Sequence, residues 1–231
     1  MKKNVVIKLD NVWKIYKMGK VKVPALQGLN LTIREDEFVA IMGPSGSGKS
    51  TAMNMIGCLD VPTKGAIYLD GQNIAHLSES DLAQIRGRRI GFIFQQFNLI
   101  PTLTALENVM LPMVFQNKPK EERVKRATEL LAQVDLSDRL HHKPTELSGG
   151  QQQRVAIARA LANDPEVILA DEPTGNLDSK SGHKFMDFLQ DFNRKQGKTI
   201  IVVTHDKLVA SHAQRIELLK DGKVIKTIKN D

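Results

Sequence analysis

Hydrophobic residues in the first part of the chain recur at every second position, which is the spacing of a β-strand. They alternate with polar residues over 5–9 and 29–33, so each strand should bury one face, as in an antiparallel sheet. Residues 38–42 form a further short apolar run. By contrast, 167–170 and 199–203 are unbroken apolar runs. Such runs favour central parallel strands that are covered on both faces.

The middle of the chain shows helical spacing instead. Thr104 and Glu107 stand three residues apart, as in a capping box, and predict the start of a helix. Pro119 opens a second helix. A third helix follows Ser148 and has to stop near Pro165. The second and third helices carry apolar stripes, formed by Val124, Ala127, Leu131 and Val134, and by Val155, Ile157, Ala158 and Leu161.

Strands and helices alternate again towards the C-terminus. A helix striped with phenylalanine and leucine is expected to end at Gly197, and Asp221-Gly222 predicts a terminal hairpin between 216–219 and 224–228. This order predicts an α/β fold, with a mixed-sheet core and flanking helices, an N-terminal antiparallel β subdomain and an inserted helical subdomain. We expect a single domain over 1–231, in which 1–97 and 164–231 form one lobe and 98–163 the other.

Residues 43–50 fit the phosphate-loop pattern G-x-x-x-x-G-K-[ST] at every fixed position. Glycines let backbone N–H groups turn inward around a phosphate, and the following helix presents its positive end to the anion. Lys49 should reach the β- and γ-phosphates, and the Ser50 hydroxyl should ligate Mg²⁺. The core is therefore expected to be that of a P-loop NTPase. ATP contacts are predicted for Gly43, Pro44, Ser45, Gly46, Ser47, Gly48, Lys49, Ser50 and Thr51.

An acid pair, Asp171 and Glu172, closes the apolar run 167–170. Ligands of open parallel sheets bind at the carboxyl ends of the strands, where the chain turns and both carboxylates can face one cleft. Asp171 suits the shell of Mg²⁺, and Glu172 suits a base that polarises the attacking water. A lone Asp-Glu pair is also typical of a polar strand end, and its position after the phosphate loop favours the catalytic interpretation.

Three further polar groups are ambiguous by residue type alone. Gln95 lies where the β core gives way to the helical block, and a glutamine there also fits a polar surface. His205 follows an apolar strand, where a hydrogen-bonded loop histidine is equally at home. Residues 148–150 combine a hydroxyl, bare backbone and a helix amino end, which suits both a helix cap and an anion cradle.

The order of these motifs resembles the ATP-binding cassette (ABC) family along essentially the whole chain. The resemblance is carried by the signature segment, residues 147–154 (Leu-Ser-Gly-Gly-Gln-Gln-Gln-Arg), between the phosphate loop and the acid pair. It implies that Gln95 touches Mg²⁺ or the water, that His205 contacts the γ-phosphate, and that Tyr16 stacks on adenine. It also implies a head-to-tail homodimer whose two ATP sites are each completed by the other chain through Ser148, Gly149, Gly150 and Gln151. Residues 176–178 would cross that interface, with Asp178 holding its geometry.

A finer resemblance is to freestanding cassettes of the lipoprotein-releasing and macrolide-efflux type, through residues 57–60, 94–99 and 171–178. It implies an ATPase subunit that drives a separate membrane permease in export, extrusion or mechanical work. Extracytoplasmic or periplasmic components would be reached through that permease. The alternative is a cytosolic or division-associated ATP-gated regulator that moves no substrate. Cargo, direction and partner are not encoded in a recognisable motif.

Composition adds limits to the function. No apolar run approaches the roughly 18 residues needed to cross a bilayer, and the N-terminus lacks a signal-peptide core. We therefore expect a cytoplasmic protein that is peripheral on the inner face of the cell membrane through its permease. The net charge of +7 is scattered among acidic residues without stacking aromatics, which argues against nucleic-acid binding. Cys58, the single cysteine, excludes an internal disulfide and should be a buried small hydrophobe.

Overall fold

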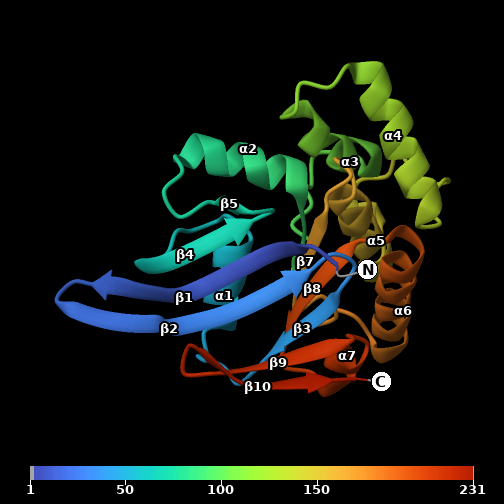
Figure 1. The fold of residues 1–231 in the computed structure, drawn as a ribbon. Helices are drawn as coiled ribbons and strands as arrows, with labels where there is room; N and C mark the ends of the chain where they lie inside the picture. The colour runs from blue at the N-terminus through green and yellow to red at the C-terminus, as the bar shows by residue number, and fades with distance from the viewer. Residues whose placement is uncertain (1–2, 231) are drawn as a thin grey trace.

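The computed structural model describes residues 3–230, which form two β-sheets and a block of helices (Figure 1). The first sheet is antiparallel, with the strand order β2-β1-β4-β5. Its strands β1 and β2 make a long hairpin that projects from the body of the molecule (Figure 1). The predicted antiparallel pairing of the first two strands is confirmed. The bounds are β1 (Val5–Met18), β2 (Val21–Arg34), β4 (Lys64–Leu69) and β5 (Gln72–Asn73).

The second sheet has the order β10-β9-β3-β8-β7-β6 and is largely parallel. Strand β3 runs parallel to β8 and β9, and β7 runs parallel to β8 and β6, while β10 returns antiparallel to β9. Every residue of β8 is buried, as the unbroken apolar run predicted. The bounds are β3 (Phe38–Met42), β6 (Ile90–Ile93), β7 (Val167–Asp171), β8 (Thr199–Thr204), β9 (Arg215–Lys220) and β10 (Lys223–Lys229).

The helices begin and end close to where capping chemistry predicts. The Thr104 N–H donates to Glu107 Oε2 at 2.8 Å, and the Glu107 N–H donates to Thr104 Oγ1 at 3.2 Å, which is the expected capping box. Gly197, with φ of +62°, ends a long helix as predicted. The bounds are α1 (Lys49–Ile56), α2 (Glu79–Arg89), α3 (Ala105–Val114), α4 (Lys120–Gln133), a 3₁₀ turn (Pro144–Glu146), α5 (Gly149–Ala160), α6 (Ser179–Gln196) and α7 (Lys207–Ser211).

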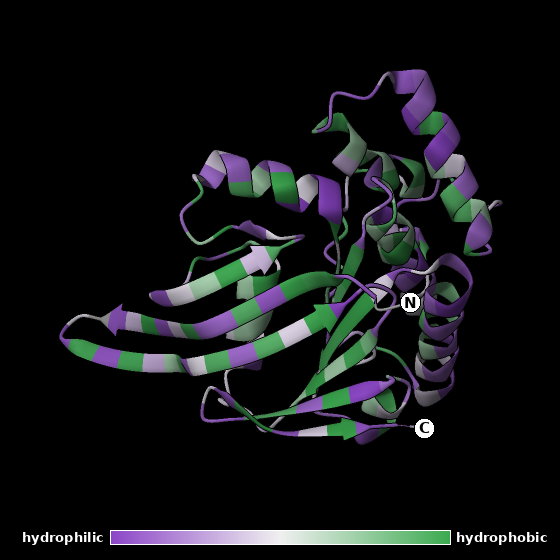
Figure 2. Ribbon diagram, viewed as in Figure 1, coloured by the Kyte–Doolittle hydropathy of each residue, from purple (hydrophilic) through white to green (hydrophobic). Residues whose placement is uncertain are grey.

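Two apolar clusters lie on opposite faces of the second sheet. One contains Phe38 and Ala40 together with helices α3, α4, α5 and α6. The other contains Val39 and Ile41 together with helix α1 and the antiparallel sheet. Figure 2 shows the central strands β7 and β8 as nearly continuous hydrophobic ribbons. Covering both faces excludes water from the strands, so the carboxyl ends of the strands are the open edge where polar side chains collect.

Several elements lie outside the predicted pattern. Strands β1 and β2 run well beyond 5–9 and 29–33, because register shifts after Leu9 and after Lys14 break the alternation along their length. Helix α2 buries only Leu82 and therefore lacks an apolar stripe. Strands β4, β5 and β6 and helix α7 also lie outside the pattern that the sequence predicts. None of the helices formed by residues 3–230 is both long and apolar enough to cross a membrane.

Candidate nucleotide site

The phosphate loop, residues 43–50, joins strand β3 to helix α1 at the carboxyl edge of the second sheet. Gly46 and Gly48 have φ of +76° and +98°, in the region that favours glycine. A Cβ atom at Gly43 would lie 2.3 Å from the Leu219 carbonyl oxygen, and one at Gly48 would lie 2.6 Å from the Ala25 carbonyl oxygen. The glycines are thus required by backbone angle and by close approach of neighbouring strands.

The interior of this loop is lined with polar groups. Lys49 Nζ donates to the carbonyl oxygens of Gly43 and Pro44 at 2.8 and 2.9 Å, so its ammonium lies against the loop. Ser47 Oγ is buried and has no hydrogen-bond partner within residues 3–230. The Gly222 N–H donates to the Ser47 carbonyl at 3.0 Å and holds the loop to the terminal hairpin. A cationic group and an unpartnered donor in a glycine cradle fit an anion with several oxygen atoms.

The acid pair ends strand β7 at the same edge of the sheet, because β3, β8 and β7 are parallel neighbours. Burial raises the pKa of the Asp171 carboxyl, the negative charge of Glu172 raises it further, and the positive charge of Lys49 opposes both. The structure therefore brings Asp171, Glu172 and Lys49 together. The Ser50 hydroxyl and the Asp171 carboxylate are oxygen donors of the kind that Mg²⁺ takes alongside substrate phosphates. No group of three or more His, Cys, Asp or Glu side chains within residues 3–230 forms a metal cage.

Glu172 is held in an unusual position. Its φ of +42° lies in the left-handed region, which is uncommon for a residue other than glycine. A proline follows it, and a residue before proline favours an extended backbone instead. The Thr204 hydroxyl donates to Glu172 Oε2 at 3.0 Å. The His205 N–H donates to Glu172 Oε1 at 3.0 Å, and His205 Nδ1 lies 2.7 Å from the same atom. Thr204 was missed by sequence reasoning, although a hydroxyl at a strand end directly before His205 was the available signal.

Tyr16 and Gln95 lie beside the site rather than at its centre. The Tyr16 hydroxyl donates to Asp60 Oδ2 at 3.1 Å, and its pKa is raised by burial, while the neighbouring Thr51 hydroxyl lowers it. The half-exposed ring thus flanks the first turn of helix α1. Gln95 is exposed and lies against Gly175, where a Cβ would be 2.7 Å from Gln95 Nε2. It is therefore close to the segment after the acid pair.

The signature segment and Asp178 form a second polar surface. Ser148 caps helix α5: its Oγ accepts from the Gln151 N–H at 3.3 Å, and its own N–H donates to Gln151 Oε1 at 2.8 Å. Asp178 caps helix α6 by accepting from the Ser181 hydroxyl at 2.7 Å and from the Ser181 N–H at 3.0 Å, and these hydrogen bonds lower its pKa. Ser148, Gly149, Gly150 and Asp178 line one cavity of about 520 Å³. Within the described residues, the phosphate loop contributes nothing to its walls.

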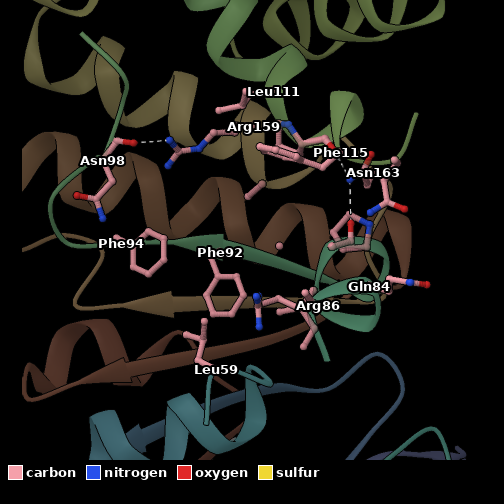
Figure 3. Close-up of a pocket in the computed structure, with 18 of the residues that line it drawn as sticks. Leu59, Gln84, Arg86, Phe92, Phe94, Asn98, Leu111, Phe115, Arg159 and Asn163 are labelled. Atoms are coloured by element: carbon pink, nitrogen blue, oxygen red, sulfur yellow. Dashed lines mark hydrogen bonds between the residues drawn. The ribbon is translucent and has the colours of Figure 1, made fainter. Parts of the chain in front are cut away.

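A groove of about 630 Å³ is lined by residues of helix α2, strand β6 and helices α3 and α5 (Figure 3). Its walls carry exposed apolar side chains, of which Phe115 is 74% exposed and Leu59 is 44% exposed. Arg159 crosses it from helix α5 and donates to the Asn98 carbonyl oxygen (Figure 3). It also donates to the Phe97 carbonyl oxygen. We call this the interlobe groove. An exposed apolar patch of this kind is typical of a surface that contacts a partner.

A glycine loop between a buried parallel strand and a helix, with an acid pair on a neighbouring strand, defines a P-loop nucleotide-binding protein. The family model described as "ABC transporter" matches residues 26–175. The uncharacterised ABC transporter ATP-binding protein MJ0796 of Methanocaldococcus jannaschii is 59% identical over 222 residues, which are 94% of each chain. The chain therefore belongs to the ABC transporter family and is one of its ATP-binding, ATP-hydrolysing cassettes.

Two further likenesses concern assembly and context. A solved dimeric structure of MJ0796, described as a post-hydrolysis state bound to ADP and Pi, has a TM-score of 0.89 and 56% identity over 97% of this chain and 99% of that one. The macrolide export ATP-binding/permease protein MacB of Brucella melitensis is 51% identical over 97% of this chain, which spans 35% of MacB. The predicted fold class and family are both confirmed by these comparisons.

Proposed function

We propose that this cassette is the nucleotide-binding subunit of an export-type transporter and that ATP drives it into a head-to-tail homodimer. In this proposal residues 1–231 are one domain, with 1–97 and 164–231 as the ATP-binding lobe and 98–163 as the helical lobe. The observation that carries the proposal is the separation of the two phosphate-binding surfaces. Ser148 and Asp178 share a cavity that the phosphate loop of the same chain does not reach. Two chains related by a twofold axis would complete each other's sites.

In each site the first chain would supply the phosphate loop, from Gly43 to Thr51, as the cradle of the triphosphate. Lys49 would leave the loop carbonyls that it now contacts and reach the β- and γ-phosphates. Tyr16 would stack on adenine. Ser50, Asp171 and Gln95 are the proposed oxygen ligands of Mg²⁺. When bound, this ion neutralises charge that develops on the transferred phosphoryl group.

Glu172 is the proposed base, and it orients the attacking water and accepts its proton. The contact between His205 and Glu172 supports this role, because it holds the carboxylate at the strand end and places an imidazole beside it. His205 is proposed to turn towards the γ-phosphate when ATP is bound, which its 76% exposed side chain leaves it free to do. From the second chain, Ser148, Gly149, Gly150 and Gln151 close the phosphate from the opposite side, while Asp178 supports the junction.

The proposed permease partner docks in the interlobe groove. The exposed apolar walls of the groove support this, and so does its position next to the segment that follows Gln95. MacB supports a membrane context, because its name joins an ATP-binding and a permease protein. On this proposal the chain is cytoplasmic and is held at the inner face of the cell membrane by the permease. Extracytoplasmic components would join on the other side, and nucleic acid has no part.

The decisive experiment compares Glu172→Gln with Lys49→Ala. Glu172→Gln should bind ATP and Mg²⁺ but hydrolyse slowly, so light scattering should report a dimer that persists at saturating ATP. Lys49→Ala should stay monomeric, because it lacks the cation that holds the triphosphate. A Glu172→Gln protein that stays monomeric with ATP bound would refute the dimer.

The permease is tested by affinity capture of the same trapped variant from gently solubilised membranes of the source cells. A stoichiometric membrane protein, absent from a parallel capture with Lys49→Ala, is the expected result. If only soluble proteins accompanied a verified dimer, the transport role would be wrong and the ATP-gated regulator would replace it.

A further inference from the structure

Gln153 ties the signature segment to the acid pair within one chain. Its side chain is 1% exposed, and its Nε2 donates to the Pro173 carbonyl oxygen at 3.0 Å across a buried contact. Pro173 directly follows Glu172. No other hydrogen bond reaches this carbonyl in the part of the chain that the structure describes. Gln153 lies on helix α5, one turn after the Ser148 cap.

The orientation of the Gln153 amide is determined by this one bond. Its Oε1 has no hydrogen-bond partner within residues 3–230 and is buried in the wall of the cavity that Ser148 and Asp178 share. A buried amide oxygen without a partner costs free energy. The reverse orientation would turn that oxygen towards the Pro173 carbonyl oxygen, which is worse. The side chain is therefore held in place by its donation to Pro173 and by close packing.

The backbone at the other end of this bond is strained. Glu172 has a left-handed φ of +42° and precedes proline, and such a conformation persists only where surrounding contacts impose it. Four contacts do so here: the Glu172 N–H donates to the Val203 carbonyl at 2.8 Å, the Glu172 carbonyl accepts from the Gly175 N–H at 3.0 Å, the Glu172 side chain is bound by β8 and His205, and Gln153 holds Pro173. Of these four contacts, only the bond from Gln153 comes from the helical block.

We infer that Gln153 is a positioning residue. Through it, the backbone conformation of Glu172 depends on the position of helix α5, the helix that the signature segment begins. The inference rests on the proposed dimer. There, helix α5 of one chain closes the ATP site of its partner, while Glu172 of that same chain acts in its own site. Gln153 thereby connects the two ATP sites through a single chain, and hydrolysis in one site responds to occupancy of the other.

The test uses mixed dimers in which one site hydrolyses. One chain carries Glu172→Gln, and its partner keeps Glu172, so every turnover depends on the intact chain's acid pair and on the other chain's signature segment. Gln153→Met preserves volume but removes the N–H donor. It is placed either in the chain that keeps Glu172 or in the chain that lacks it. Two different affinity tags isolate the mixed species, and the single-turnover rate of ATP hydrolysis is measured.

Gln153→Met is expected to slow hydrolysis about tenfold or more when it lies in the chain that keeps Glu172, because a misplacement of about 1 Å in a reacting group can cost about a hundredfold in rate. It should have little effect in the other chain. Gln152→Met is the matched control, since the Gln152 amide donates to Leu147 within the signature segment itself. Any loss of rate that Gln152→Met causes should appear when it lies in the chain that lacks Glu172, because that chain supplies the signature segment to the active site. Gln153→Asn, which keeps an amide but shortens its reach, repeats the test if the methionine variant folds poorly.

Equal losses in both placements, or no loss in either, would overturn the inference and leave the dimer standing. A Glu172→Gln protein that forms no dimer with ATP would instead remove the proposed function, and this inference with it. Thermal unfolding of the homodimeric Gln153→Met protein shows whether the variant is destabilised. A loss of hydrolysis rate that is due only to destabilisation would be the same whichever chain of the mixed dimer carried Gln153→Met.

Discussion

Glu172 and His205 are joined through one carboxylate oxygen: the His205 backbone N–H donates to Glu172 Oε1 at 3.0 Å, and His205 Nδ1 lies 2.7 Å from the same atom. The imidazole can donate to this oxygen from Nδ1 in the tautomer that carries its hydrogen there. The other oxygen accepts from the Thr204 hydroxyl at 3.0 Å. The proposed base is thus oriented by consecutive residues at the end of strand β8.

Thr204→Val should lower kcat about tenfold and leave the Kd for ATP unchanged. The substitution keeps the shape of the side chain but removes a hydroxyl whose bond to a charged group is worth roughly 1.5–3 kcal/mol. That hydroxyl bonds Glu172 and the Asp206 N–H, and within residues 3–230 it makes no hydrogen bond to the phosphate loop. ATPase assays and equilibrium ATP binding measure the two effects separately. Thr204→Ser retains the hydroxyl and should keep most of the activity. A change confined to ATP affinity would show that Thr204 does not act through Glu172.

Asp171→Asn should stabilise the nucleotide-free protein at neutral pH. Burial and the charge of Glu172 raise the folded-state pKa of Asp171, so its charged form disfavours folding at pH values above that pKa. The penalty is absent below the unfolded pKa, where the carboxyl is protonated in both states. The variant's advantage in thermal midpoint should therefore be largest near neutral pH and shrink as the pH falls into the aspartate range. An advantage that is the same at every pH would contradict this electrostatic cause.

Gly46→Ala and Gly48→Ala should separate backbone strain from steric contact. Gly46 has φ of +76°, and a Cβ added there would meet no atom within 4 Å, so alanine should cost about 1–2 kcal/mol through the left-handed angle alone. At Gly48 the added atom would also lie 2.6 Å from the Ala25 carbonyl oxygen, and the loss should be larger. Urea unfolding of both variants without nucleotide measures the difference. Equal losses would mean that strand β2 moves aside.

Tyr16→Ala should weaken ATP binding about tenfold and leave the affinity for inorganic tripolyphosphate unchanged. A ring that stacks on adenine contributes roughly 1–3 kcal/mol per base, whereas the phosphate loop alone holds the tripolyphosphate. Tyr16→Phe keeps the ring, loses only the hydroxyl that bonds Asp60, and should bind ATP almost as well as the parent. Competition with a fluorescent ATP analogue gives all three affinities. An equal loss for both ligands would place Tyr16 in support of the loop instead.

The fold was predictable where the signal was local. Strand β8 was visible because it is buried on both faces and is apolar throughout its centre. Helix α2 was missed because a helix that buries one leucine has no stripe to detect. The extended parts of β1 and β2 were missed for a related reason, because bulges shift the alternation out of register.

The sequence by itself determined the phosphate loop, the helix caps and the acid pair. These features depend on backbone conformations and hydrogen bonds within a few residues, so residue type and spacing are sufficient to specify them. They also identified the family, since three such motifs in one order are rarely accidental.

Only the tertiary structure decided which of these groups meet. It joined Glu172 to His205, set Tyr16 beside helix α1, and connected Gln153 to Pro173. It also placed Ser148 with Asp178, apart from the phosphate loop. These contacts join segments that are distant in sequence, and they arise because burying the two faces of the parallel sheet brings the strand ends and helix α5 to common positions. No local pattern encodes that packing.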